Sequence, residues 1–294
     1  MTIVWLLTAI CALVLILALT VFLIWVGYSR KVLSGVSKRF FLPSREMHQT
    51  PADFGVDYEE HRVVSIDERG AEVSLSCWFV PAKESSVCVL FFHGNQGNIS
   101  DRRETIKLYS KLGLSCFYVD YQGYGASEGT CSMQALEQDA LASFDYLVES
   151  LGIEKNQIIV HGRSMGGYPA SYLSSNREFG GLIVESSFTC GKELLLREHP
   201  WLLIWGWKDS FPLQEHLMER AEKPLMILHS PSDERIPYSM SQTLVKSYPG
   251  KVELKRMQGS HDTGFLATRP RYDQWLLEFA NDMSSSNSHQ KVAL

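Results

Sequence analysis

The chain has 294 residues, of which 45% are hydrophobic and 21% charged, so it can bury a substantial core. Its net charge of −5 argues against a nucleic-acid partner. Its six cysteines are scattered and include no Cys-x-x-Cys pair, so there is no sign of a disulfide framework and a reducing compartment is favoured.

The N-terminal segment resembles a membrane anchor. The first 29 residues carry no charged side chain, and residues 3–26 are almost wholly apolar. A helix of that length spans about 36 Å, enough to cross a bilayer. Trp5 near one end, and Trp25 with Tyr28 near the other, match interfacial anchors. A cleaved signal peptide, the alternative, needs a basic start and a shorter apolar core. We therefore predict one transmembrane helix over residues 3–26.

Basic residues follow this helix before the first acidic residue, Glu46: Arg30, Lys31, Lys38, Arg39 and Arg45. The positive-inside rule then places the C-terminal side of the helix, and with it the domain that follows, in the cytoplasm. The same cluster could bind anionic lipid head groups. We expect residues 27–58 to form a basic juxtamembrane linker.

Residues 59–282 show the pattern of one α/β domain. Alternating apolar residues at 61–67 and 71–80 predict a β-hairpin. Apolar runs then alternate with amphipathic segments. Strands are predicted at 86–92, 114–121, 157–162, 181–185, 224–229 and 252–257, and helices at 100–112, 132–151, 237–248 and from Pro270 onward. This order predicts an α/β fold with a doubly wound, mostly parallel sheet and an antiparallel N-terminal edge. The Ser-rich residues 283–294 are predicted to be a disordered tail.

The strand predicted at 157–162 runs into Gly162-Arg163-Ser164-Met165-Gly166, a Gly-x-Ser-x-Gly turn that precedes a helix. Such a turn forces its central residue into a strained backbone conformation, and side chains at 162 and 166 would collide. The Ser164 hydroxyl would then project from the sheet edge beside the positive end of a helix, as a nucleophile requires. The alternative is a Gly-rich turn without chemistry.

A serine nucleophile needs a base and an acid that orients the base. Asp233 follows the strand predicted at 224–229, and His261 follows the strand predicted at 252–257. A turn Asp alone is more often a cap, and a lone loop His is rarely catalytic. However, Ser164, Asp233 and His261 follow three successive strand ends, which meet at the same edge of a parallel sheet.

The oxyanion hole needs two backbone N–H groups directed at the developing negative charge. We assign one to Met165, directly after the nucleophile. We assign the other to Asn95, in the Gly-rich loop after the strand predicted at 86–92, with Gln96 as the alternative.

Four motifs in this order resemble the α/β-hydrolase superfamily, in the bud-emergence-type branch of abhydrolase-domain serine hydrolases. They are His93-Gly94-Asn95-Gln96-Gly97-Asn98, Asp120-Tyr121-Gln122-Gly123-Tyr124-Gly125, Gly162-Arg163-Ser164-Met165-Gly166-Gly167 and Val184-Glu185-Ser186-Ser187-Phe188-Thr189. The resemblance covers about residues 60–282. It implies hydrolysis of carboxylic esters or thioesters through Ser164, Asp233 and His261. Ser230 and Gln122 depart from the pattern, which usually has Gly and Arg there.

Residues 187–222 lie where this fold carries its lid, and they are strongly apolar. The lid is either a small packed cap or the lining of an acyl-chain pocket that could touch the bilayer. The sequence thus predicts a membrane-anchored serine hydrolase that acts on small-molecule or lipid esters and needs neither metal nor cofactor. An amidase or peptidase using the same residues, and a non-catalytic membrane scaffold, are the alternatives.

Overall fold

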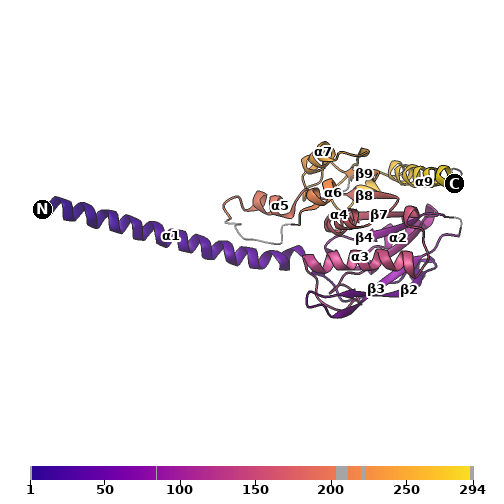
Figure 1. Cartoon of the computed structure of the whole chain (residues 1–294), viewed down its shortest axis with the longest axis horizontal. Helices are drawn as coiled ribbons and strands as arrows, with labels where there is room; N and C mark the ends of the chain where they lie inside the picture. The colour runs from indigo at the N-terminus through magenta and orange to yellow at the C-terminus, as the bar shows by residue number, and fades with distance from the viewer. Residues whose placement is uncertain (1, 84, 203–210, 220–222, 292–294) are drawn as a thin grey trace.

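The computed structural model describes the backbone of residues 2–83, 85–202, 211–219 and 223–291. At its centre is an eight-stranded sheet with the strand order β10-β9-β8-β7-β4-β6-β3-β2 (Figure 1). The strands are β2 (Glu59–Ile66), β3 (Glu72–Val80), β4 (Cys88–Phe92), β6 (Ser115–Val119), β7 (Ile158–Arg163), β8 (Gly181–Glu185), β9 (Leu225–His229) and β10 (Val252–Arg256). β3 runs antiparallel to β2 and β6, and the other neighbours are parallel. The predicted α/β fold with its antiparallel N-terminal edge is confirmed.

Helices cover both faces of the sheet and bury one core on each side. Leu90 and Phe92 of β4 belong to one core, whereas Val89 and Phe91 belong to the other, because successive strand residues point to opposite faces. α3 (Met133–Glu149), α4 (Gly167–Asn176) and α7 (Tyr238–Ser247) pack on the first face, and α2 (Arg103–Lys111) and α9 (Arg271–Lys291) on the second. Burial on both faces explains why the central strands are continuous apolar runs.

A single long helix, α1 (Thr2–Phe40), projects from the domain (Figure 1). Within it, residues Ile3–Val32 are long and apolar enough to cross a membrane, and the described residues bury none of the 18-residue window that meets this test. The helix continues without a break to Phe40, through the first part of the segment expected to be a linker, residues 27–58. The first proline of the chain is Pro43, so no proline interrupts helix propagation before that point.

The rest of the expected linker is attached to the domain. The ring of Phe40 stacks on that of Phe211 with centroids 4.3 Å apart, and Phe41 is buried in the first core. The short strand β1 (Leu42–Pro43) pairs in parallel with β5 (Gln96–Gly97), in the loop that follows β4. α1 is therefore joined to the domain by an aromatic contact and a strand pairing.

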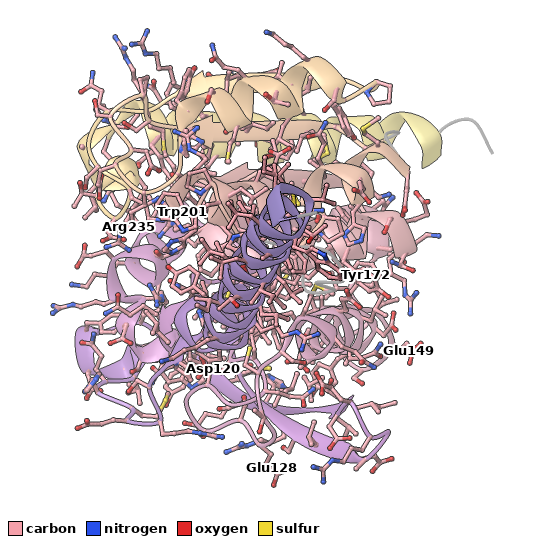
Figure 2. All side chains as sticks on the ribbon, turned by 90° about the vertical axis from the view of Figure 1, so that its left-hand side faces the viewer. Asp120, Glu128, Glu149, Tyr172, Trp201 and Arg235 are labelled. Atoms are coloured by element: carbon pink, nitrogen blue, oxygen red, sulfur yellow. The ribbon has the colours of Figure 1, made fainter. Side chains whose placement is uncertain are left out.

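The lid region contains α5 (Gly191–Glu198) and α6 (Leu213–Glu219). Trp201, after α5, is 58% exposed and lies on the face from which α1 projects (Figure 2). Four apolar residues of the predicted lid lie outside the described residues: Leu203, Ile204, Trp205 and Trp207.

α9 extends to Lys291, into the segment 283–294 that the sequence predicts to be a disordered tail. No Gly or Pro occurs between Arg271 and Lys291, so each added residue extends the helix by one more hydrogen bond. The short helix α8 (Gly264–Ala267) precedes α9.

The attachment of α1 can be tested at two adjacent residues. Phe41 is 8% exposed, so Phe41→Ala should lower the free energy of unfolding by about 3–5 kcal/mol through lost burial and a residual cavity. The Leu42 side chain is 48% exposed, and Leu42→Ala should change that free energy by no more than about 0.5 kcal/mol. Urea unfolding of the detergent-solubilised full chain measures both, and equal effects would contradict this packing.

Candidate active site

At Ser164 the chain turns from β7 into α4 through one turn of 3-10 helix, η4 (Ser164–Gly166). Ser164 has φ of 54°, in the left-handed region that non-glycine residues seldom adopt. A Cβ on Gly162 would lie 2.3 Å from the carbonyl oxygen of Gly166, and a Cβ on Gly166 would lie 2.1 Å from that of Phe92. Both contacts are too short for a side chain. Glycine is therefore required on both sides of Ser164.

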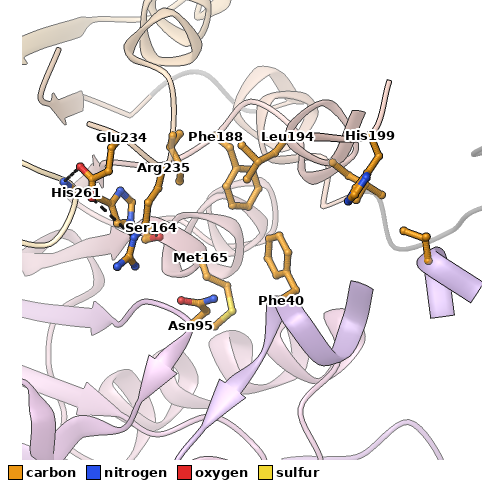
Figure 3. Close-up of a pocket in the computed structure, with 13 residues that line it drawn as sticks. Phe40, Asn95, Ser164, Met165, Phe188, Leu194, His199, Glu234, Arg235 and His261 are labelled. Atoms are coloured by element: carbon orange, nitrogen blue, oxygen red, sulfur yellow. Dashed lines mark hydrogen bonds and ion pairs between the residues drawn. The ribbon is translucent and has the colours of Figure 1, made fainter. Parts of the chain in front are cut away.

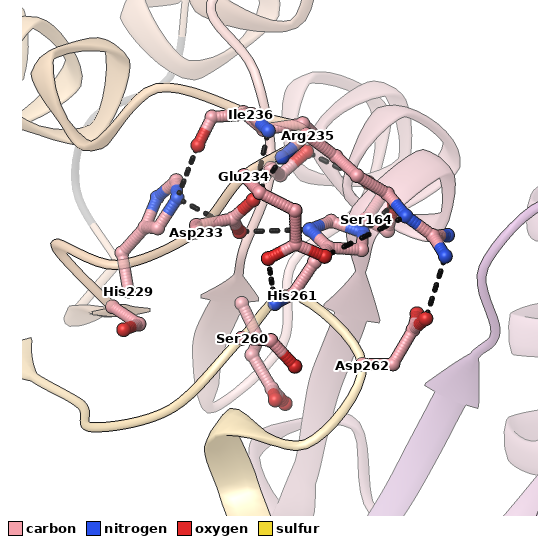
Figure 4. A network of polar contacts seen from close by, with 12 residues as sticks. Ser164, His229, Asp233, Glu234, Arg235, Ile236, Ser260, His261 and Asp262 are labelled. Atoms are coloured by element: carbon pink, nitrogen blue, oxygen red, sulfur yellow. Dashed lines mark hydrogen bonds and ion pairs between the residues drawn. The ribbon is translucent and has the colours of Figure 1, made fainter.

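The structure brings the three predicted catalytic side chains together (Figure 4). Ser164 Oγ lies 2.9 Å from His261 Nε2, and His261 Nδ1 lies 2.7 Å from Asp233 Oδ2. Because an ionised carboxylate only accepts hydrogen bonds, Nδ1 carries the proton, and Nε2 is left to accept from the Ser164 hydroxyl. The arrangement can move a proton from Ser164 to His261 while Asp233 stabilises the resulting imidazolium.

Asp233 is held in its ionised form by the turn around it. The backbone N–H groups of Arg235 and Ile236 donate to its Oδ1 at 2.9 and 2.8 Å. Burial by itself raises the pKa of Asp233. Hydrogen bonds from His229, His261 and the Ile236 N–H outweigh burial and bring this pKa well below its usual range.

Two residues that support this centre have no assignment from the sequence. His229 Nε2 lies 3.2 Å from Asp233 Oδ2 and donates to the carbonyl oxygen of Ile236 at 3.0 Å. Glu234 accepts the backbone N–H of His261 at 3.1 Å, which ties the loop carrying the base to the loop carrying the acid. His229 ends β9 four residues before Asp233, but spacing alone does not show that the turn folds back onto it.

The loop after β4 lies against the nucleophile. A Cβ on Gly94 would be 3.5 Å from Ser164 Cβ. His93 Nδ1 donates to the Gly94 carbonyl oxygen at 2.6 Å, and since a peptide unit is planar, this bond also orients the N–H of Asn95. Asn95 lines both cavities that contain Ser164, including the one that Met165 lines (Figure 3), whereas Gln96 lines the larger one and pairs through β5 with Leu42 of β1. This placement favours Asn95 over Gln96 as the second oxyanion donor.

A buried ionic cluster lies beneath the elbow. Arg163 Nε, His161 Nε2 and the hydroxyl of Tyr272 all lie within 3.0 Å of Glu185 Oε2. Burial raises the pKa of Glu185, but Arg163, His161 and Tyr272 together lower it to about 2. The Arg163 guanidinium also stacks 4.1 Å from the ring centroid of Phe265, which follows the His261 loop. The cluster thus connects the elbow to the segment that follows His261.

The two departures from the family pattern have structural roles. The Ser230 hydroxyl donates to the Gly259 carbonyl oxygen and accepts from Ser232 N at 3.1 Å, so it links the loops of Asp233 and His261. Gln122 donates to Asp139 from its backbone N–H at 2.8 Å and from Nε2 at 2.9 Å. Gln122 brings no positive charge. Burial therefore raises the pKa of Asp139 to about 6 despite these hydrogen bonds.

Ser164 lies between two cavities of different character. One, of about 400 Å³, has Ser164 and His261 at one end and is also lined by the polar residues Asn95, His199, Glu234 and Arg235 (Figure 3). Its apolar lining comes from Val32, Phe40, Phe188, Leu194, Leu195 and Ile236. The other, of about 890 Å³, is lined by the Gly94–Gly97 loop and by charged side chains such as those of Arg102 and Asp262. Val32 and Phe40 were not among the predicted site residues, because both come from the segment assigned to the linker, residues 27–58.

A parallel sheet with a strained serine after a central strand, and with an acid and a base after two later strands, defines the α/β hydrolases. The chain is similar in structure to the Pyrococcus furiosus esterase Pf2001, with a TM-score of 0.67 and 19% identity over 83% of this chain and 98% of that one. It is also similar to an α/β hydrolase from Vibrio vulnificus, with a TM-score of 0.59 and 23% identity over 80% and 82% of the two chains. At these identities the likeness shows the fold.

Sequence comparison narrows the class. Residues 103–273 match the prolyl oligopeptidase family. The chain is 29% identical to protein bem46 of Schizosaccharomyces pombe over 66% of its own length and 67% of the relative's. It is 31% identical to the α/β hydrolase domain-containing protein WAV2 of Arabidopsis thaliana, over 70% and 69% of the two lengths. The chain therefore belongs to the prolyl oligopeptidase family of α/β hydrolases, in the branch that holds bem46 and WAV2.

The cluster beneath the elbow gives a test of stability against pH. A carboxylate whose folded pKa lies below its unfolded value of 4.5 stabilises the fold at higher pH, and this stabilisation disappears as pH falls through about 2. Glu185→Gln should thus lower the unfolding free energy at pH 7 by about 3 kcal/mol, because Arg163 loses its buried counter-charge.

Chemical unfolding between pH 7 and pH 2 measures this difference. The wild-type and Glu185→Gln curves should converge near pH 2. Glu149→Gln, which removes an exposed carboxylate at the end of α3, should follow the wild type throughout. A constant gap between wild type and Glu185→Gln at all pH values would contradict the assignment.

Proposed function

We propose that this hydrolase is a membrane-anchored serine esterase or thioesterase that acts through Ser164, His261 and Asp233. The observation that carries the proposal is the chain of contacts from Ser164 Oγ to His261 Nε2, at 2.9 Å, and from His261 Nδ1 to Asp233 Oδ2, at 2.7 Å. Both distances lie within the range needed for general-base activation of a serine. A scaffold without chemistry would not require a strained serine between two obligatory glycines.

The reaction proceeds by acyl transfer. His261 Nε2 takes the proton of Ser164 as Oγ attacks the substrate carbonyl carbon. The N–H groups of Met165 and Asn95 stabilise the negative charge that develops on the carbonyl oxygen. His261 then gives its proton to the departing alcohol or thiol. Water attacks the acyl-enzyme by the same route, with His261 as base, and releases the carboxylic acid.

The two cavities favour esters with an apolar acyl group. The apolar cavity can hold the acyl chain, and the polar cavity beside the Gly94–Gly97 loop can hold a polar leaving group. The family match leaves peptide or amide bonds as the second candidate, because the same three side chains cleave amides in other hydrolases.

We further propose that α1 crosses the membrane once and that the catalytic domain faces the cytoplasm. The helix continues from the apolar residues 3–26 into the domain, and the exposed residues Arg30 and Lys31 follow those residues. Arg45, the last residue of the basic cluster, contacts the domain instead, because its guanidinium donates hydrogen bonds to the carbonyl oxygens of Ser127 and Gly129.

A fluorophosphonate probe tests the nucleophile. The full-length wild type should be labelled, and Ser164→Ala should lose the label and at least about 10⁴-fold in kcat for ester hydrolysis. Ser150→Ala, at the exposed end of α3, is the matched control and should keep both. Absence of label on folded wild-type protein would overturn the proposed function.

A panel of esters, thioesters and amides with the same acyl group then identifies the bond that is cleaved. Esters or thioesters should be turned over faster than the amide. Preference for the amide would replace the proposed esterase by an amidase or peptidase on the same residues.

Protease accessibility tests the orientation. In sealed inside-out membrane vesicles, added protease should digest the catalytic domain without detergent, because the positive-inside rule places that domain on the cytoplasmic face. Digestion of the domain in right-side-out vesicles, with protection in inside-out ones, would reverse the proposed orientation. Detergent should expose the domain in both preparations.

A further inference from the structure

One face of the membrane helix contacts the lid. Trp25 Nε1 donates to the carbonyl oxygen of Trp201 at 2.6 Å, and Val32 packs against Leu195 and Leu202. Ser29, between Trp25 and Val32, is 1% exposed. Spacings of four and three residues place Trp25, Ser29 and Val32 on one side of the helix. The contact with the lid therefore forms a stripe along about two turns of α1.

The same stripe leads into the cavity at Ser164. Val32 and Phe40 of α1 line the apolar cavity together with Leu194 and Leu195 of α5. The Phe40 ring faces that of Phe188, with centroids 5.7 Å apart, between the catalytic end of the cavity and the lid (Figure 3). The helix thus forms part of the pocket wall in addition to projecting from the domain.

The length of α1 places this wall near the membrane surface. The stretch that could cross a membrane, Ile3–Val32, has 30 residues and includes the charged residues Arg30 and Lys31 near its end. Such a stretch spans roughly 45 Å, whereas the hydrocarbon core is about 30 Å thick and needs about 20 residues. The last turns of the stretch, from Trp25 to Val32, therefore extend to the polar interface, where Trp and Tyr are favoured. Trp201 lies at the same level and is 58% exposed on the face from which α1 projects (Figure 2).

We propose that α1 and α5 form the two walls of an acyl passage that opens at the bilayer surface and ends at Ser164. The substrate class is then a membrane-resident ester with a long acyl chain, which enters between Val32 and Leu195 without passing through water. The polar part of such a lipid would occupy the cavity beside the Gly94–Gly97 loop. This inference rests on the proposed serine hydrolase and adds the source and chain length of its substrate.

Narrowing the passage should alter the chain-length preference. Val32→Trp fills the wall beside Leu195. In full-length protein reconstituted in phosphatidylcholine vesicles, it should lower the turnover of a vesicle-embedded p-nitrophenyl palmitate at least tenfold relative to soluble p-nitrophenyl butyrate. Ile24→Trp, at a residue 67% exposed on another face of α1, is the matched control and should leave this ratio within twofold. An unchanged ratio in folded Val32→Trp, or an equal loss on both esters, would overturn the passage.

A second experiment requires no substitution in the passage. A palmitoyl ester with a diazirine at its chain end is incorporated into vesicles that contain Ser164→Ala, which cannot hydrolyse it under the proposed mechanism. Photolysis should crosslink it to the peptides that carry Phe40 and Leu195, in addition to the lipid-facing part of α1. Crosslinks confined to the lipid-facing part of α1 would contradict the inference, including in the case that Val32→Trp fails to fold.

The two proposals can fail separately. Lack of fluorophosphonate labelling together with crosslinks at Phe40 and Leu195 would reject the serine hydrolase and leave a lipid-binding passage. Normal hydrolysis of the short ester by Val32→Trp and the wild type, with an unchanged ratio and no such crosslinks, would reject the passage alone.

Discussion

At Ser164 the chain passes from β7 to α4 with φ of 54°, and the backbone of the turn packs against itself and against Phe92. This close approach leaves no room for a Cβ on Gly162 or Gly166. The strain of the left-handed serine persists because the surrounding strands and helix hold it in place. This geometry places the hydroxyl of the half-buried Ser164 at the carboxyl edge of the sheet, where the loops after the later strands can reach it.

Two buried carboxylates, those of Glu185 and Asp233, hold these loops in position relative to the turn at Ser164. Glu185 neutralises Arg163, and the Arg163 guanidinium stacks on Phe265 beyond the base. Asp233 receives backbone and imidazole hydrogen bonds that keep it charged in a buried turn. Buried charges are costly unless they are paired and hydrogen-bonded, so each carboxylate also specifies how its neighbours are arranged. His261 is thereby oriented from two sides, through Asp233 on its side chain and Glu234 on its backbone.

The uninterrupted α1 joins the proposed membrane anchor to the site. A flexible linker would leave the domain free to turn relative to the bilayer, whereas a continuous helix closed by the Phe40–Phe211 stack and the β1–β5 pairing restricts that motion. The same helix contributes Val32 to the apolar cavity. Anchor, lid and pocket are thus parts of one contiguous apolar surface, which gives the anchor a physical role in substrate selection under the proposed mechanism.

The sequence by itself determined the α/β fold and the apolar N-terminal helix. These depend on local properties: hydrophobic periodicity, runs buried on both faces, and a Gly-x-Ser-x-Gly turn whose steric requirement is set within five residues. The grouping of Ser164, Asp233 and His261 was also accessible, because successive parallel strands end at one edge. Their catalytic roles remain predictions.

Only the tertiary structure decided which supporting residues meet. His229 folds back on Asp233, Glu185 pairs with Arg163, and Trp25 reaches the carbonyl of Trp201 across 176 positions of the sequence. No periodicity or local motif encodes such contacts, because they depend on how separate elements pack. For the same reason a segment read from its composition as anchor and linker proved to contribute a wall of the pocket. Local sequence determines which segments form helices, strands and turns. Packing between elements that are distant in the sequence determines which residues come into contact.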